Sequence, residues 1–167
     1  MVGNEGVLGF SLALGARTAP HRAVVQCAGQ GFRLQAGVLI EEFRRGGTMA
    51  HMLLRYTLMV GTQMAQTAVC NRYHTVDQQL CRWLLMCLDR QPGEELVTTQ
   101  EVISNRLGVR REGVTEAASK LQAAGIIQYS RGRIRILARA ELESRACECY
   151  RTLRRDYDEL LRSYNSP

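Results

Sequence analysis

The chain has 167 residues, enough for one domain of ordinary size or for two small domains that share a helix. A hydrophobic content of 46% and a charged content of 23% are typical of a globular protein, and the net charge of +6 is compatible with a polyanionic partner. The absence of a signal peptide and of an apolar run near about 18 residues predicts a cytoplasmic chain with no membrane partner and with reduced cysteines.

Residues 1–35 contain a few strand-like pieces separated by glycines and by Pro20. The clearest are Ala23–Gln26 and Gly31–Leu34. Two short strands are too few to close a core of any size. We therefore expect this region either to be poorly ordered or to be completed by a partner chain.

Residues 48–72 have the pattern of one long helix that begins at a Thr48 cap. Its apolar residues recur every three or four positions in two adjacent stripes. The stripes are Met49, Met52, Tyr56, Met59 and Gln63, and Leu53, Val60, Met64 and Thr67. A helix that is apolar on two sides needs partners on two sides. The N-terminal region of the same chain and a second copy of the helix would provide them, which predicts a symmetric homodimer. The alternative is a core helix in a monomer.

A second helix follows a short hinge at Tyr73 and His74. Thr75 and Gln78 form a capping-box pair at its start. One face of this helix is apolar, through Val76, Leu80, Trp83, Leu84, Cys87 and Leu88. Residues 91–95 are predicted to form the loop after it.

Residues 97–125 predict two short helices around a glycine-containing turn. Thr98 and Glu101 form a capping-box pair for the first helix, and Gly108 permits the turn that ends it. The second helix begins near Arg110 or Arg111 and runs to about residue 124. Its core-facing stripe is Val114, Ala117, Ala118 and Leu121.

The opposite face of this second helix is polar, through Arg110, Arg111, Glu112, Thr115, Glu116 and Ser119. An arginine at the helix start offers no cap acceptor, so contact with phosphate explains it better than local stability does. Arginine can also bind guanine through two hydrogen bonds, and glutamate can accept one from cytosine. The pattern predicts a helix that enters the DNA major groove.

A basic hairpin comes next, with strands at Ile126–Tyr129 and Arg133–Leu137 joined through Ser130, Arg131 and Gly132. Together with the helix pair it predicts a winged helix-turn-helix. Arg131 and Arg133 would then contact phosphates, although the same arginines are also consistent with a charge-protected hairpin edge. An amphipathic C-terminal helix is predicted from Leu142 to Tyr164.

The segment TTQEVISNRLGVRREGVTEAASKLQAAGII resembles the helix-turn-helix of the Crp/Fnr family of bacterial transcription regulators, and IIQYSRGRIRILARAELE resembles its wing. The start of the family's recognition helix is matched by Arg110, Arg111, Glu112 and Val114. The resemblance implies that Arg111 and Glu112 contact bases, with Thr99 and Gln100 near the DNA backbone. Glu116 stands where the family often has arginine, which implies a different preferred half-site.

Residues 5–45 are similar to the second half of the family's cyclic-nucleotide-binding-type β-roll. The resemblance implies an α+β, mainly helical fold in three parts. These are a truncated roll at 1–47, a dimerisation helix and hinge at 48–74, and a winged helix-turn-helix domain with a C-terminal helix at 75–167. Because the chain opens inside the roll, we expect a truncated sensor domain or a start codon assigned too late.

No cofactor or metal is predicted. Val7 stands where a cyclic-nucleotide-binding relative needs an acidic residue, and the family's Arg-Ser phosphate cassette is not reproduced. The first four cysteines lack tight ligand spacing, and Cys147 and Cys149 would point roughly 200° apart on one helix, which suits zinc poorly. The histidines are scattered. We expect the cysteines to act as small buried hydrophobes.

These observations predict a sequence-specific, homodimeric DNA-binding transcription regulator rather than an enzyme, since no catalytic motif is present. Its partners would be double-stranded DNA, a second copy of the chain and RNA polymerase. Two alternatives remain open. The chain could be an interaction module that dimerises with full-length relatives, or a small-molecule sensor with little DNA binding of its own.

Overall fold

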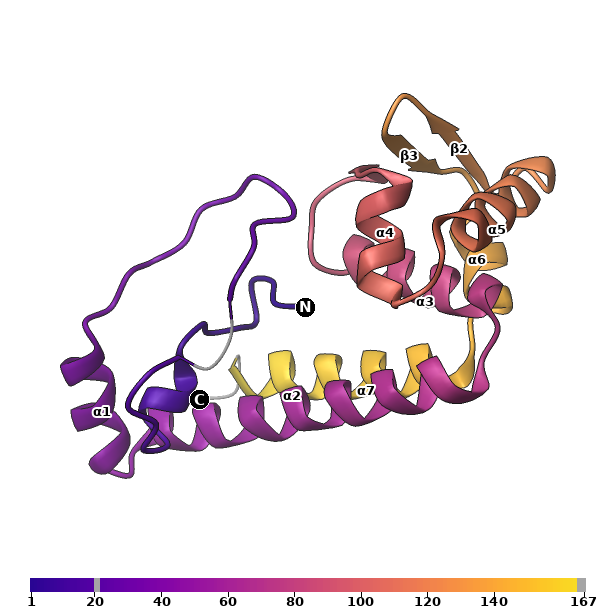
Figure 1. The fold of residues 1–167 in the computed structure, drawn as a ribbon. Coiled ribbons are helices and arrows are strands. Elements are labelled where there is room, and N and C mark those ends of the chain that lie inside the picture. The colour runs from indigo at the N-terminus through magenta and orange to yellow at the C-terminus, as the bar shows by residue number, and fades with distance from the viewer. Residues whose placement is uncertain (20–21, 165–167) are drawn as a thin grey trace. The chain divides into compact units, whose positions relative to one another are not determined.

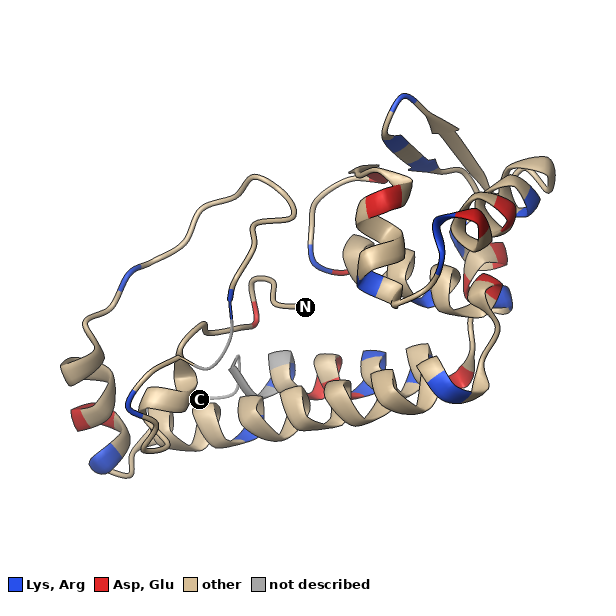
Figure 2. Ribbon diagram, in the orientation of Figure 1, with Lys and Arg blue, Asp and Glu red and all other residues tan. Residues whose placement is uncertain are grey.

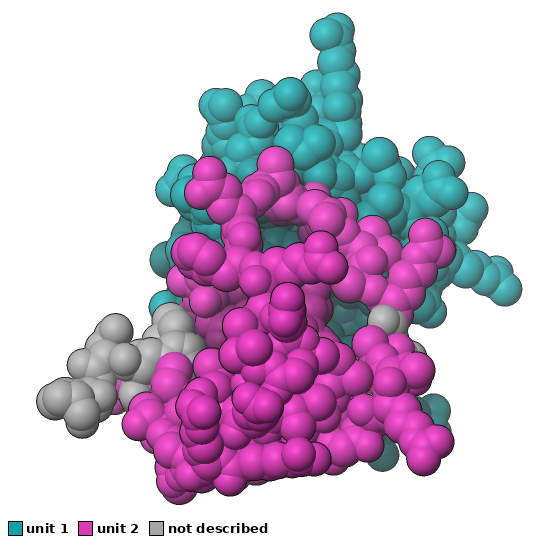
Figure 3. Space-filling view, turned by 90° about the vertical axis from the view of Figure 1, so that its left-hand side faces the viewer, with its two compact units in different colours: residues 1, 63–155 teal, residues 2–62, 156–167 magenta. Residues whose placement is uncertain are grey.

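The structure is a computed structural model that describes residues 1–19 and 22–164. It is mainly helical with one small antiparallel sheet, which confirms the predicted fold class (Figure 1). The chain divides into two compact units, one made of residues 1 and 63–155 and the other of residues 2–62 and 156–167 (Figure 3). Among the described helices, none combines the length and hydropathy needed to cross a bilayer.

The unit of residues 2–62 and 156–167 contains the 3-10 turn η1 (Phe10–Leu12), helix α1 (Ala36–Arg44) and the first part of helix α2 (Thr48–Tyr73). The strands expected at 23–26 and 31–34 are wrong, because both segments are coil. Their apolar side chains are largely exposed, Val25 by 83%. An alternating pattern alone does not stabilise a strand that has neither a pairing partner nor an apolar surface to cover it.

The core of this unit is built on α2. Tyr56, Met59 and Leu160 are buried together, with Phe10 packed on them. The rings of Phe10 and Tyr56 meet edge to face with centroids 5.4 Å apart. The helix predicted at 48–72 is confirmed.

The other unit holds the remaining elements. They are α3 (Val76–Leu88), β1 (Glu95–Val97), α4 (Gln100–Leu107), α5 (Arg111–Ala123), β2 (Ile127–Ser130), β3 (Arg133–Ile136), α6 (Arg139–Arg145) and the start of α7 (Glu148–Tyr164). The capping box at Thr75 and Gln78 is confirmed at the start of α3. Every residue of α3 from Gln79 to Leu88 is buried, so this helix lies at the centre of the unit's core.

The sheet has the strand order β1-β3-β2, with both pairs antiparallel. The two predicted hairpin strands are found within one residue of their expected bounds. Strand β1 differs from the prediction, which gives residues 91–95 as a loop. A three-residue strand carries too little periodicity to be recognised, and it exists here because β3 offers it a free edge.

The single C-terminal helix predicted from Leu142 is wrong in one respect, since the structure has two helices. Ala146 ends α6 in an extended conformation, with φ −72° and ψ 151°. Cys147 and Cys149 are both buried. A continuous helix would place these two residues on opposite faces, so the interruption allows both side chains to turn inward.

Candidate nucleic-acid interface

Helix α4 begins one residue later than the sequence indicates. Its N-cap is Thr99, whose hydroxyl accepts a 3.2 Å hydrogen bond from the Val102 N–H. The predicted cap, Thr98, instead donates its N–H to the Gly132 carbonyl at 2.8 Å. This bond holds Thr98 against the β-hairpin, which leaves Thr99 as the first residue that can turn into the helix.

The turn between α4 and α5 depends on Gly108, which has φ 69° and ψ 31°. This left-handed conformation is strained for any residue with a Cβ atom, so glycine sets the direction in which α5 leaves. The Val109 N–H then bonds to the Ser104 carbonyl at 3.1 Å. The two helices pack through Ile103 and Leu107 of α4 in the main core of the unit.

Helix α5 confirms the predicted core stripe, because Val114, Ala117, Ala118 and Leu121 are all buried. Its N-cap is Arg110, and no side chain caps the first turn. Arg110, Arg111 and Glu112 are exposed at that end. The first turn of α5 therefore presents its free backbone N–H groups and two arginines to solvent.

The remaining predicted residues of the two helices lie close together. The Thr115 hydroxyl is 2.7 Å from Gln100 Oε1 and 3.0 Å from the Arg111 carbonyl. The Gln100 side chain is thus held against the exposed face of α5. Glu116, the residue after Thr115, is exposed and pairs with Lys120 at 2.9 Å. The pKa of Lys120 is raised by its hydrogen bonds to Glu116 and then to Asp77.

The wing turn consists of Arg131 and Gly132, with φ values of 48° and 75°. Positive φ at both central residues is typical of the tight type I′ turn, whose twist matches that of the flanking strands. Arg131 is exposed at this turn, and Figure 2 shows basic residues at the tip of the hairpin.

Arg133 has a partner that the sequence did not indicate. Its guanidinium donates to Glu95 Oε1 at 2.7 Å, and Arg135 lies 3.4 Å from the other carboxylate oxygen. These hydrogen bonds hold the pKa of Glu95 below its usual value, and the bond from Arg133 has the largest effect. Two of the three wing arginines therefore share one carboxylate, and Arg131 extends beyond them.

The chain is similar to solved transcription regulators. The structures include a protein described as a regulator of the Crp/Fnr family from Eubacterium rectale ATCC 33656, at 24% identity with a TM-score of 0.51, covering 66% of this chain and 51% of that one. They also include a CRP-family regulator from Thermus thermophilus, at 22% identity and a TM-score of 0.48, covering 59% and 51%. The chain thus spans about half the length of these structures.

Both solved structures are described as transcriptional regulators. No curated protein matches the sequence. The Crp-like helix-turn-helix domain matches residues 78–145, the range that holds α4, the Gly108 turn, α5 and the wing. This part of the chain is thus similar to a Crp-like helix-turn-helix domain.

Proposed function

We propose that the chain is a sequence-specific DNA-binding transcription regulator that acts as a homodimer, with α5 in the major groove. The observation that carries this proposal is the exposed first turn of α5. In the described part of the chain, the side chains of Arg110 and Arg111 have no ion-pair partner. Two cations at the end of a rigid helix are thus free to bind an external polyanion.

Each residue of this end has a distinct role in the proposal. Arg111 binds guanine through two hydrogen bonds, and Glu112 accepts one from a cytosine amino group. Arg110, at the N-cap, contacts phosphate together with the free N–H groups of the first turn. Thr115 lies one turn further along the same exposed face, and Glu116 completes that face.

The DNA backbone is held from both sides of α5. Thr99 and Gln100 contact it at the start of α4, where Gln100 is already fixed against Thr115. Arg131 contacts phosphate at the wing turn. Arg133 contributes less, because Glu95 neutralises part of its charge.

The homodimer is supported by an apolar stripe on α2. Exposed residues repeat along it at three- and four-residue intervals, the spacing of a coiled-coil seam. They are Leu54, Leu58, Gly61, Ala65 and Ala68. Leu58 alone is 73% exposed. A second copy that covers this stripe would provide two recognition helices for two half-sites. We place the regulator in the cytoplasm, with RNA polymerase as a further partner.

Selection from a pool of randomised duplexes, followed by a mobility shift at stated salt, tests the proposal. We expect enrichment of a twofold-symmetric site, and loss of that enrichment in the double variant Arg110→Ala/Arg111→Ala. Arg151→Ala, an exposed arginine of α7, is the matched control and should select the same site. Failure of the wild-type protein to enrich any symmetric site contradicts the proposal.

A further inference from the structure

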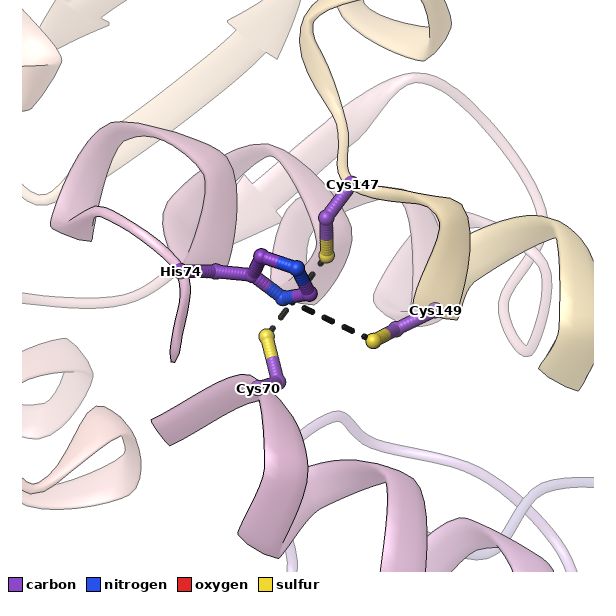
Figure 4. A group of neighbouring side chains, drawn as sticks. All are labelled: Cys70, His74, Cys147 and Cys149. Carbon is purple, nitrogen blue, oxygen red and sulfur yellow. Dashed lines mark hydrogen bonds between the residues drawn. The ribbon is translucent and has the colours of Figure 1, made fainter. Parts of the chain in front are cut away.

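Four side chains that the proposed function does not use converge where α2 ends and α7 begins. They are Cys70, His74, Cys147 and Cys149, and their donor atoms all lie within 4.8 Å of one another (Figure 4). The three cysteines are buried, and the His74 side chain is 13% exposed. We propose that these residues bind one Zn²⁺ ion in a closed, tetrahedral Cys₃His site.

The spacing of the donor atoms fits a single zinc ion. Zinc binds thiolate sulfur at about 2.3 Å and imidazole nitrogen at about 2.0–2.1 Å. In a tetrahedron these lengths place two sulfurs about 3.8 Å apart and a sulfur and a nitrogen about 3.6 Å apart. The Sγ atoms of Cys70 and Cys147 are 3.6 Å apart, and Cys149 Sγ is 3.6 Å from His74 Nδ1.

The first two ligands come from the C-terminal end of α2. Cys70 and His74 are four residues apart, and the His74 N–H bonds to the Cys70 carbonyl at 3.0 Å, so both side chains lie on the same side. The buried Gln79 amide donates to the His74 carbonyl at 2.9 Å and to the Cys70 carbonyl at 3.4 Å. The backbone of both ligands is thereby fixed from α3.

The other two ligands depend on the break before α7. Cys147 precedes the helix and Cys149 lies in its first turn. The thiols can therefore point to the same place, although a continuous helix would separate them. The expectation that these cysteines serve as small hydrophobes explains their burial but not their grouping, since Cys70, Cys147 and Cys149 form a cluster apart from the main core.

Glu148 provides the hydrogen bond that commonly supports a metal-binding histidine. Its Oε1 is 3.2 Å from His74 Nε2, the ring nitrogen that does not face Cys149. A carboxylate on the remote nitrogen fixes the imidazole with Nδ1 unprotonated toward the metal and increases its basicity. Glu148 thus orients His74 without contacting the ion.

Arg82 supplies the charge that such a site requires. Three thiolates, a neutral imidazole and Zn²⁺ carry a net charge of −1, which is costly in a protein interior. Arg82 is 4% exposed and interacts electrostatically with both Cys70 and Cys149. Its guanidinium bonds to the Thr67 hydroxyl at 3.3 Å, while its Nε has no hydrogen-bond partner among the described residues. A buried cation that has no carboxylate partner in the described part of the chain fits an anionic metal centre.

The role of this zinc is structural. All four tetrahedral positions are filled by protein, which leaves no open position for a substrate. The ion would join the last turn of α2 to the first turn of α7 through bonds that neither helix can make alone. Its binding energy would then contribute to folding of the unit that contains residues 63–155.

The test is the metal content and metal affinity of the full chain, purified in the presence of reductant. We expect elemental mass spectrometry to find about one zinc ion per chain. Replacement by Co²⁺ should give the intense ligand-field and thiolate charge-transfer absorption of a tetrahedral sulfur-rich site. Cys70→Ser and Cys147→Ser should abolish this spectrum, whereas Cys87→Ser, another buried cysteine, should leave it unchanged.

A second variant keeps the test decisive if the cysteine variants do not fold. The Glu148 side chain is 68% exposed, so Glu148→Gln should fold and weaken zinc binding by about 10–100-fold in chelator competition. The proposal is overturned if the reduced protein takes up no zinc, if Glu148→Gln binds it as tightly as wild type, or if iron and sulfide occupy the cysteines. None of these outcomes bears on DNA binding.

Discussion

Glu95 and Arg133 lie on neighbouring antiparallel strands, and the Glu95 carboxylate accepts a 2.7 Å hydrogen bond from the Arg133 guanidinium. This pair decides how much positive charge the wing presents. The same carboxylate also attracts Arg135. In the proposed complex, a phosphate must therefore compete with Glu95 for these two arginines, whereas Arg131 has no such competitor among the described residues.

Glu95→Gln should strengthen DNA binding. Removing the carboxylate frees Arg133 for phosphate, so affinity should rise to a similar extent for every sequence, and the salt dependence should steepen by about one phosphate contact. Glu94→Gln, which makes the same charge change one residue away, is the control and should have the smaller effect. Fluorescence anisotropy across a salt series measures both, and equal gains in the two variants would refute a specific role for the pair.

Arg111→Ala and Arg131→Ala should weaken DNA binding in different ways. If Arg111 contacts a guanine, its loss should cost about 1–3 kcal/mol and relax specificity at one base position. If Arg131 contacts phosphate, its loss should weaken all sequences alike and reduce the salt slope by about 1. Binding to a set of single-base operator variants separates the two roles. A uniform loss in Arg111→Ala would assign Arg111 to phosphate.

Leu58→Glu should convert the dimer to a monomer. A carboxylate on the exposed stripe of α2 would have to be buried at the interface, where it has no partner. Because Leu58 is exposed within one chain, the fold itself should not change. Light scattering after size-exclusion chromatography measures the mass. Leu137→Glu, at an exposed leucine beside the wing, is the control and should remain dimeric. A dimeric Leu58→Glu protein would show that the exposed stripe of α2 is not the dimer interface.

Asp89→Ala should strongly destabilise the unit that contains the winged domain. The buried Asp89 side chain accepts from Arg139 at 2.5 Å and Arg154 at 2.6 Å, and from the Tyr150 hydroxyl at 3.1 Å. Its removal takes a buried carboxylate from both arginines and the acceptor from the buried Tyr150 hydroxyl, which should cost about 1–3 kcal/mol. Glu143→Ala removes an exposed partner of Arg139 and should cost about 1 kcal/mol or less. Urea denaturation compares the two.

Tyr150 should make the protein less stable at high pH. Burial, and next the charge of Asp89, raises its pKa from 10.0 to about 12. Below pH 10 the phenol is protonated in both the folded and the unfolded chain, so its full contribution to stability is present. As the pH rises from 10 to 12, only the unfolded chain loses this proton, so the free energy of unfolding falls.

The size of this effect follows from the shift, which corresponds to a loss of about 3 kcal/mol. Tyr150→Phe cannot ionise, so its deficit relative to wild type should shrink over this pH range. Denaturation midpoints measured for both proteins give the difference, and a deficit that stays constant with pH would contradict the assignment.

Local sequence patterns predict helix faces, helix caps and the hairpin correctly where the interacting residues are also close in the sequence. The stripe from Val114 to Leu121 predicts the buried face of α5 because residues three and four apart share one side of a helix. The capping box at Thr75 and the exposed, uncapped Arg110 follow from the same local geometry. The alternation in β2 and β3 likewise predicts the hairpin.

Other features depend on residues far apart in the chain, and the sequence pattern does not contain them. Glu95 and Arg133 are separated by 38 positions, and Cys70 and Cys147 by 77. The cap moves from Thr98 to Thr99 because Thr98 bonds to Gly132 across the turn. The strands expected near Val25 fail for the opposite reason, since no segment among the described residues pairs with them.

Local sequence patterns are enough to locate α2, α3, α4 and α5 and to identify the buried face of α5, because hydrophobic periodicity and capping act within one or two turns. Which charges neutralise each other and which thiols come together depends on contacts between residues that are far apart in the sequence. Electrostatic and ligand contacts act over a few ångströms of space, and the chain reaches those distances through its long-range packing.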